Sequence, residues 1–217
     1  MILLSVVIAL VLNSVSAQSP LARTEIGQPK SLAADYLLPS NIKPSLYEVE
    51  LEPNFDAATF NGSIRITVSV VATTNAIVLH TYQLTVETAS ISLLDVNGAV
   101  VNSIAGTSFS NDDRQFYTIS FEEVLVEGNV YTLIIDSFSG ILNSQNDGFY
   151  LARYTDEEGN TRKLATTQFE ATSARRAFPC FDERKLFDTI FVTENWPPHN
   201  SKPLVPGEPF PASMNQH

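Results

Sequence analysis

The sequence contains little cysteine, little histidine and few basic side chains. Cys180 is the single cysteine among 217 residues, so no disulfide can form within the chain and the fold must depend on its apolar core. The three histidines are His80, His199 and His217. No two of them are four residues apart and none precedes a glutamate, which excludes the His-Glu-x-x-His zinc motif and predicts no metal site in this sequence.

Basic residues are outnumbered by acidic ones. The chain has 13 Lys and Arg residues against 24 Asp and Glu, which gives a formal net charge of -11. A phosphate backbone requires a basic surface, so nucleic acid is excluded as a partner. An acidic surface suits a cationic ligand, but a solvated face that keeps the protein soluble is the simpler interpretation.

Only one apolar run stands out, and it lies at the N-terminus. Residues 2–12 are apolar except for Ser5, and Val15 and Ala17 follow with the small side chains of a cleavage site before Gln18. The run is too short to span a bilayer, so we expect a cleaved signal peptide over residues 1–17, although a buried strand or helix is the alternative. The sequon at Asn61 predicts glycosylation, and both features predict a secreted, extracellular protein without a membrane span.

Helical periodicity is also missing, and alternation of period two takes its place. Tyr47, Val49 and Leu51 alternate with glutamates, which is typical of a strand with one buried face. Turns are predicted at 97–98, 127–129 and 158–160, and further strands at 64–70, 76–80, 84–94, 116–121 and 130–136. We therefore expect an all-β fold, an antiparallel saddle-shaped β-sandwich-like domain, over residues 38–193. A flexible lead over 18–37 and an unstructured proline-rich tail over 194–217 complete the prediction.

Candidate chemistry gathers between residues 148 and 183. Gln168 and Glu170 flank Phe169, so on a strand their side chains point to one face, where an amide oxygen and a carboxylate can hold a primary ammonium. Two arginines at 175–176 precede two acidic residues at 182–183, which suggests an ion-pair cluster. Spacing alone leaves open a structural interpretation, in which these polar side chains satisfy one another at a sheet edge.

This segment resembles a known family. The sequence GFYLARYTDEEGNTRKLATTQFEATSARRAFPCFDE is similar to the end of the N-terminal domain in aminopeptidase N-type enzymes of the zinc gluzincin class. The phrases LPSNIKPSLYEVELEPN and TFNGSIRITV resemble the family further upstream, so the resemblance covers roughly residues 38–183. The family's FDEP phrase becomes FDER here, and residues 185–194 are compatible with one more strand.

The resemblance implies roles for particular residues. Gln168 and Glu170 would bind the free N-terminus of a peptide, while Arg175, Arg176, Cys180 and Asp182 would give structural support. Cys180 is expected to be a buried, inert thiol. The family's catalytic zinc is held by HExxH and a further Glu, which this sequence lacks, as it lacks the Gly-Ala-Met-Glu-Asn phrase. We therefore expect a truncated, inactive member with no catalytic residues and no cofactor of its own.

Two further expectations concern partners. The chain would bind peptide N-termini only weakly, and a face exposed by the missing catalytic domain would receive that domain from a separate chain or promote self-association. Four phenylalanines lie near this junction: Phe178, Phe181, Phe187 and Phe191. The alternative from a different class is a secreted, non-enzymatic β-sandwich binding module, which would bind peptide N-termini or another extracellular protein.

Overall fold

The computed structural model describes residues 36–101, 103–110, 112–156, 158–183 and 190–194. These residues form an all-β domain whose strands are paired almost entirely antiparallel, as predicted. The predicted signal peptide, most of the predicted lead, and residues 195–217 of the predicted tail lie outside the described residues. No helix in the described ranges is long and apolar enough to cross a membrane.

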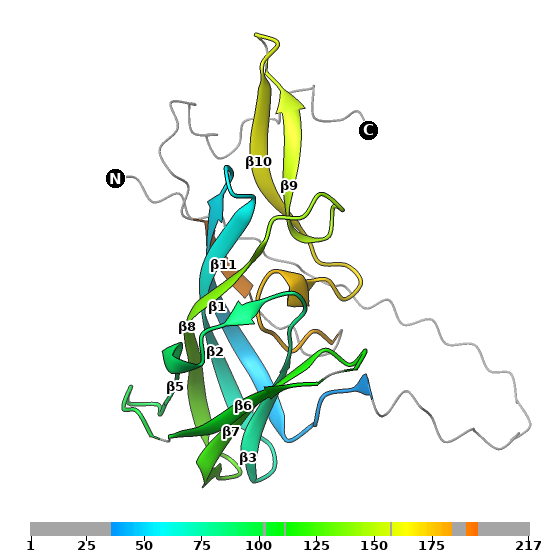
Figure 1. The fold of residues 1–217 in the computed structure, drawn as a ribbon. Helices are drawn as coiled ribbons and strands as arrows, with labels where there is room; N and C mark the ends of the chain where they lie inside the picture. Colours follow the sequence, from blue (N-terminus) through cyan, green and yellow to red (C-terminus); the bar gives the residue numbers. More distant parts are fainter. Residues whose placement is uncertain (1–35, 102, 111, 157, 184–189, 195–217) are drawn as a thin grey trace, which may run out of the picture.

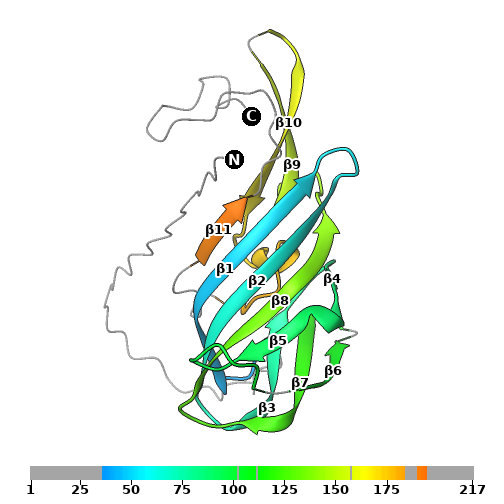
Figure 2. The same cartoon turned by 90° about the vertical axis from the view of Figure 1, so that its left-hand side faces the viewer.

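The largest sheet has six strands. β1 (Ile42–Asn54), β2 (Thr59–Val70) and β8 (Val130–Ile141) form its centre, and β4 (Thr85–Val86) and β5 (Ile91–Leu94) both pair with β8. β11 (Ile190–Glu194) pairs with β1 in parallel, the exception to the antiparallel pattern, and Figure 2 shows it beside β1 at the sheet edge. The alternation predicted in β1 is confirmed, because Tyr47, Val49 and Leu51 are buried while the intervening glutamates are exposed.

Two smaller sheets complete the domain. β3 (Thr74–His80), β7 (Phe116–Leu125) and β6 (Ile104–Phe109) make a three-stranded sheet, and β9 (Gly148–Thr155) with β10 (Thr161–Gln168) makes a two-stranded one. Inward side chains of all three sheets join one apolar core, which contains Ile64, Ile119 and Phe149. The β9–β10 hairpin extends away from the rest of the molecule at the top of Figure 1.

The predicted single strand over residues 84–94 is wrong. The chain forms β4, then a 3-10 turn, η2 (Thr88–Ser90), and then β5. Ser90 explains the break: its hydroxyl donates to the carbonyl oxygen of Glu87 at 2.7 Å and to that of Ser137 in β8 at 3.2 Å, which gives the chain an alternative to the ladder. Both short strands still pair with β8 on either side of the turn.

The three predicted turns are confirmed, but some join strands of one hairpin and others join strands of different sheets. Gly98, Gly128 and Gly159 all have positive φ, between 81° and 86°, which glycine adopts at little cost. The turn at Gly159 closes the β9–β10 hairpin, whereas the turn at Gly128 carries the chain from β7 in the three-stranded sheet to β8 in the six-stranded one. Turn chemistry in the sequence therefore locates reversals without indicating which strands pair.

Candidate functional site

The predicted amine ligands lie where the hairpin rejoins the domain. Gln168 is the last residue of β10, paired with Gly148 at the start of β9, and both Gln168 and Glu170 are exposed. Phe169 is half-buried and packs edge-to-face on Phe178, with ring centroids 5.5 Å apart. The chain thus presents the two polar side chains to solvent and directs the phenylalanine between them into the core.

The prediction that a strand carries both ligands needs correction. β10 ends at Gln168, and Glu170 lies in a turn joined to Ala171 by a cis peptide bond. The backbone N–H of Ser173 donates to the carbonyl oxygen of Phe169 at 2.9 Å, which replaces the ladder bonds that a continuing strand would make. Gln168 and Glu170 are exposed neighbours across a strand end, and binding of an amine by them stays a prediction.

A half-buried ion pair supports the base of the hairpin. The Nε of Arg176, in the 3-10 turn η3 (Ala174–Arg176), lies 2.7 Å from a carboxylate oxygen of Asp147. Its guanidinium also donates to the side-chain oxygen of Gln83 at 2.9 Å and lies 4.2 Å from the ring centroid of Tyr82. The expected cluster of residues 175–176 with residues 182–183 is therefore confirmed only for the first arginine, because Arg176 binds elsewhere.

That first arginine forms a more deeply buried network. The Nε of Arg175 lies 2.8 Å from a carboxylate oxygen of Asp182, and its guanidinium also donates to the side chain of Gln115 at 3.1 Å. Burial raises the pKa of Asp182 above its usual 3.8, although the hydrogen bonds and charge of Arg175 oppose that shift. The pair links η3 to the end of the described segment, which fits the structural support that the resemblance implied.

His80 completes this network without resembling a metal ligand. It is 2% exposed, and its Nδ1 accepts the backbone N–H of Asp182 at 3.3 Å, which places the proton of the neutral ring on Nε2. Burial, and then the charge of Arg175, lower its pKa from 6.5 to about 3. The ring is also 5.2 Å from that of Phe116 in an edge contact. His80 is a neutral core histidine.

Cys180 is buried, as expected. It is 0% exposed and its backbone pairs with His80 through bonds of 2.7 and 3.1 Å. Burial raises the pKa of the Cys180 thiol well above its usual value. Tyr47 lies nearby, accepts the backbone N–H of Phe181 at 3.1 Å, and has its pKa raised by burial as well. A thiol with a raised pKa holds little thiolate at neutral pH and is a poor nucleophile.

The predicted exposed junction face is corrected by the structure. Phe178 and Phe181 are 0% and 1% exposed and belong to the common core. Phe178 packs against Tyr47 as well as Phe169, with ring centroids 6.5 Å apart in the first pair. Residue 187 lies outside the described residues, and of Phe191 only the backbone is described. Self-association through this face therefore loses two of the four side chains that suggested it.

The remaining site residues concern a metal and a glycan. Across the described ranges, no three His, Cys, Asp or Glu side chains are placed to hold a metal ion, so these residues do not fit the zinc of the resembled family. Asn61 lies on β2 and is exposed, so its side chain is accessible, and its glycosylation stays a prediction.

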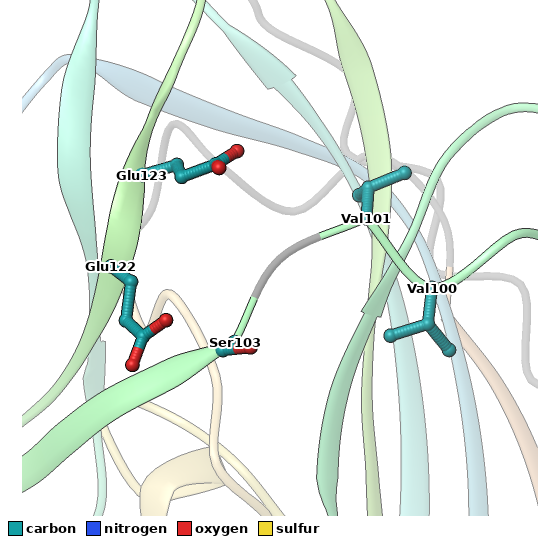
Figure 3. A pocket seen from close by; sticks show the side chains of 5 residues that line it. All are labelled: Val100, Val101, Ser103, Glu122 and Glu123. Atoms are coloured by element: carbon teal, nitrogen blue, oxygen red, sulfur yellow. The ribbon is translucent and has the colours of Figure 1, made fainter.

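A shallow pocket lies on another part of the domain. It is lined by Val100, Val101, Ser103, Glu122 and Glu123. Figure 3 shows the valines on one side and the two β7 glutamates on the other, and Figure 1 places β7 at the opposite end of the molecule from the hairpin. The pocket is thus separate from the Gln168–Glu170 edge.

The partners of Arg176 could not be predicted from the motifs in the sequence. Gln83 lies 93 positions away in the sequence, and Asp147 lies just before the candidate segment of residues 148–183. Gly148 was the one sign of this contact in the sequence, because a glycine in a strand often marks a site where another part of the chain approaches the backbone closely. It has φ of +71°, and a Cβ built there would lie 2.5 Å from Cβ of Arg176.

Comparison with known proteins identifies the family. The peptidase M1 N-terminal domain family matches residues 43–186. Three similar proteins are alanine/arginine aminopeptidase of Saccharomyces cerevisiae (41% identical over 160 residues), aminopeptidase M1 of Arabidopsis thaliana (34% over 156) and endoplasmic reticulum aminopeptidase 1 of Rattus norvegicus (33% over 149).

These matches involve most of this chain and little of each relative. They cover 72%, 72% and 69% of this chain, but only 18%, 17% and 16% of the three relatives, respectively. The chain therefore spans less than a fifth of the length of the aminopeptidases that it matches. Its alternating strands, its hairpin and the segment that ends at Glu183 all fall within the matched region or close to it. The chain belongs to the family of peptidase M1 N-terminal domains.

Proposed function

We propose that this domain binds the free N-terminus of a peptide through Gln168 and Glu170, as the amine-binding part of an M1-type aminopeptidase. The observation that carries the proposal is the exposure of both side chains at one strand end, within the region that matches the family. A carboxylate and an amide oxygen give an α-ammonium charge-assisted hydrogen bonds, and holding that ammonium fixes the distance to the first peptide bond.

Removal of N-terminal amino acids is proposed for the assembled enzyme rather than for this polypeptide. The relatives are named aminopeptidases, and zinc is a property of M1 aminopeptidases. The 217 residues contain neither HExxH nor the Gly-Ala-Met-Glu-Asn phrase, so the polypeptide by itself is inactive. The two exposed side chains act as one half of a pocket, and a catalytic domain supplies the other half.

An exposed half-pocket binds weakly. An ion pair in solvent contributes about 0–1 kcal/mol, so we expect a dissociation constant of about 1 mM or weaker for a simple amine. Nuclear magnetic resonance measures such affinities well. Leucinamide is titrated into the labelled protein while the amide signals of residues 168–171 are followed, and N-acetyl-leucinamide, which lacks the ammonium, is the ligand control.

Two glutamates make a matched pair of variants for this titration. Glu170→Ala is expected to weaken leucinamide binding by about fivefold, the effect of losing up to about 1 kcal/mol. Glu158→Ala removes an exposed carboxylate at the far end of the same hairpin and should leave binding unchanged. Equal binding of leucinamide and its acetylated form, or equal effects of the two substitutions, would refute the amine site.

The second experiment concerns catalysis. The purified 217-residue protein is incubated with aminoacyl-p-nitroanilides and added zinc, beside an intact M1 aminopeptidase as the positive control. We expect release of nitroaniline only by the control. If peptidase activity elutes together with the polypeptide through two chromatographic steps, the proposal that the polypeptide is inactive is wrong.

Secretion and glycosylation are proposed from the N-terminal run and the sequon. The expected mature protein begins at Gln18 and carries one glycan on Asn61. Expression in a eukaryotic secretory host, N-terminal sequencing and treatment with an amidase that removes N-glycans check both. Retention of Met1, or a mass unchanged by the amidase, would contradict the respective proposal, and Asn61→Gln is the control for the sequon.

A further inference from the structure

The hairpin that carries Gln168 depends on its base for its position. β9 and β10 pair only with each other among the described strands, apart from a bridge between Asn143 and Tyr150. A two-stranded hairpin in water is marginally stable at best, so its direction depends on its contacts with the rest of the domain. Higher up the hairpin, Nζ of Lys163 donates to the carbonyl oxygen of Phe55 at 2.8 Å, and further polar contacts lie at its base. Figure 1 shows the hairpin extending away from the larger sheets, with η3 and its neighbouring loops at its foot.

Arg176 joins three separate segments at that foot. It belongs to η3, its Nε lies 2.7 Å from a carboxylate oxygen of Asp147 before β9, and it donates to Gln83 at 2.9 Å in the loop after β3. The guanidinium plane also covers the ring of Tyr82 at 4.2 Å. The arginine and Asp147 side chains are 24% and 26% exposed, so solvent screens the pair only in part.

The contact reaches the amine edge through the first rung of the hairpin. Asp147 is followed by Gly148, and Gly148 is the register partner of Gln168. A Cβ at Gly148 would lie 2.5 Å from Cβ of Arg176 and 3.2 Å from the carbonyl oxygen of Ser173, so η3 packs directly on this rung. A displacement of Asp147 is therefore passed to Gly148 through the chain, and from Gly148 to its register partner Gln168.

We propose that Arg176 is a positioning residue, which fixes the direction of the β9–β10 hairpin and thereby aligns Gln168 with Glu170 for binding of an ammonium group. The inference rests on the proposed amine site for its functional consequence. The planar guanidinium makes the ion pair, the hydrogen bond and the ring contact at once, whereas a lysine ammonium is a point charge on a flexible stem. Lysine at this position would keep the attraction to Asp147 and lose the fixed geometry.

The chain offers a closely matched control. Arg162 and Asp156 form an ion pair between the same two atom types at the same 2.7 Å, but at the other end of the hairpin, where the arginine side chain is 52% and the aspartate side chain 15% exposed. The variants are Arg176→Ala, Arg176→Lys and Arg162→Ala, all in the full chain. Asp147→Asn, which keeps the shape of the side chain and removes its charge, tests the same contact if Arg176→Ala does not fold.

The first measurement tests only the direction of the β9–β10 hairpin relative to the six-stranded sheet. Residual dipolar couplings of amides in β9 and β10 are compared with those in β1, β2 and β8. We expect Arg176→Ala or Asp147→Asn to change the hairpin couplings while the main sheet keeps its own, and Arg162→Ala to change neither. Hairpin couplings that remain as in the wild type after loss of Arg176 would overturn the proposal.

The second measurement is the leucinamide titration. Arg176→Ala should weaken leucinamide binding by about threefold, because a misaligned Glu170 loses part of an exposed ion pair with the ammonium. The affinity of Arg176→Lys should lie between those of Arg176→Ala and the wild type. Unchanged affinity in Arg176→Ala would overturn the positioning role. If the wild type does not bind leucinamide at all, the amine site fails, and the dipolar couplings still decide whether Arg176 sets the direction of the hairpin.

Discussion

The neutral state of His80 predicts a specific loss of stability in mild acid. Its pKa is lowered from 6.5 to about 3 in the folded protein by burial and by the charge of Arg175. Between pH 6.5 and pH 3 the imidazole of His80 is protonated in the unfolded chain but stays neutral in the folded chain. The contribution of His80 to stability is therefore complete above pH 6.5 and declines as the pH falls towards 3. Between pH 7.5 and pH 5 the expected loss is about 2 kcal/mol, at about 1.4 kcal/mol for each pH unit below 6.5.

Asp182 changes the stability in the opposite direction as the pH falls. Burial raises its pKa in the folded state, so its ionised form is penalised and its protonation favours folding as the pH falls through that raised pKa. That gain opposes the loss at His80. Asp182 is present both in the wild type and in a variant that lacks His80, so comparing the two proteins at the same pH values separates the histidine effect from the carboxyl effect.

The assay is urea unfolding of the wild type and of His80→Asn at both pH values. The asparagine side-chain oxygen can accept the N–H of Asp182 in place of Nδ1, and it does not titrate. His80→Asn will be less stable overall because it loses the contact with Phe116, but its loss between the two pH values should be smaller by about 2 kcal/mol. Equal losses in the two proteins would refute the neutral, buried histidine.

Three further predictions test the packing around the site. Gly148→Ala should lower the free energy of unfolding in urea by about 2–4 kcal/mol, because residue 148 has positive φ and its added Cβ would meet Arg176. Gly159→Ala, at a residue with positive φ and open space around it, should lower it by only about 1 kcal/mol. Equal losses would contradict the close approach of Gly148 to Arg176. Phe178→Ala should lower the free energy of unfolding by about 3–5 kcal/mol, and a loss below about 1 kcal/mol would show that this ring is not in the core. Cys180 should resist iodoacetamide in the native protein and react fully in urea, and rapid native labelling would disprove its burial.

Local patterns predicted much of the fold. The alternation of Tyr47, Val49 and Leu51 with glutamates identified β1 and its buried face, since successive side chains of a strand point to opposite faces. The glycines at 98, 128 and 159 located three turns because positive φ is a property of the residue itself. Each of these features is decided within a few residues, so one sequence is enough to find it.

Features that depend on distant partners escaped prediction. Residues 84–94 had strand composition, but hydrogen bonds from Ser90 to Glu87 and Ser137 interrupt the strand. Phe178 was expected on an exposed face because it lies near the predicted junction with a catalytic domain, yet its ring is buried and packs on Tyr47 from β1, far away in the sequence. The aromatic side chains around it were visible in the sequence, but their mutual placement was not.

The sequence by itself determined the all-β character, the turn positions, the family resemblance over residues 38–183 and the candidacy of Gln168 and Glu170, because these reside in composition, period and local phrases. Only the tertiary structure decided that β10 ends at Gln168, that Arg175 binds Asp182 while Arg176 binds Asp147, and that His80 is neutral. The reason is physical: a charge selects its partner, and a ring its protonation state, according to which groups the folded chain brings within a few ångströms and removes from water.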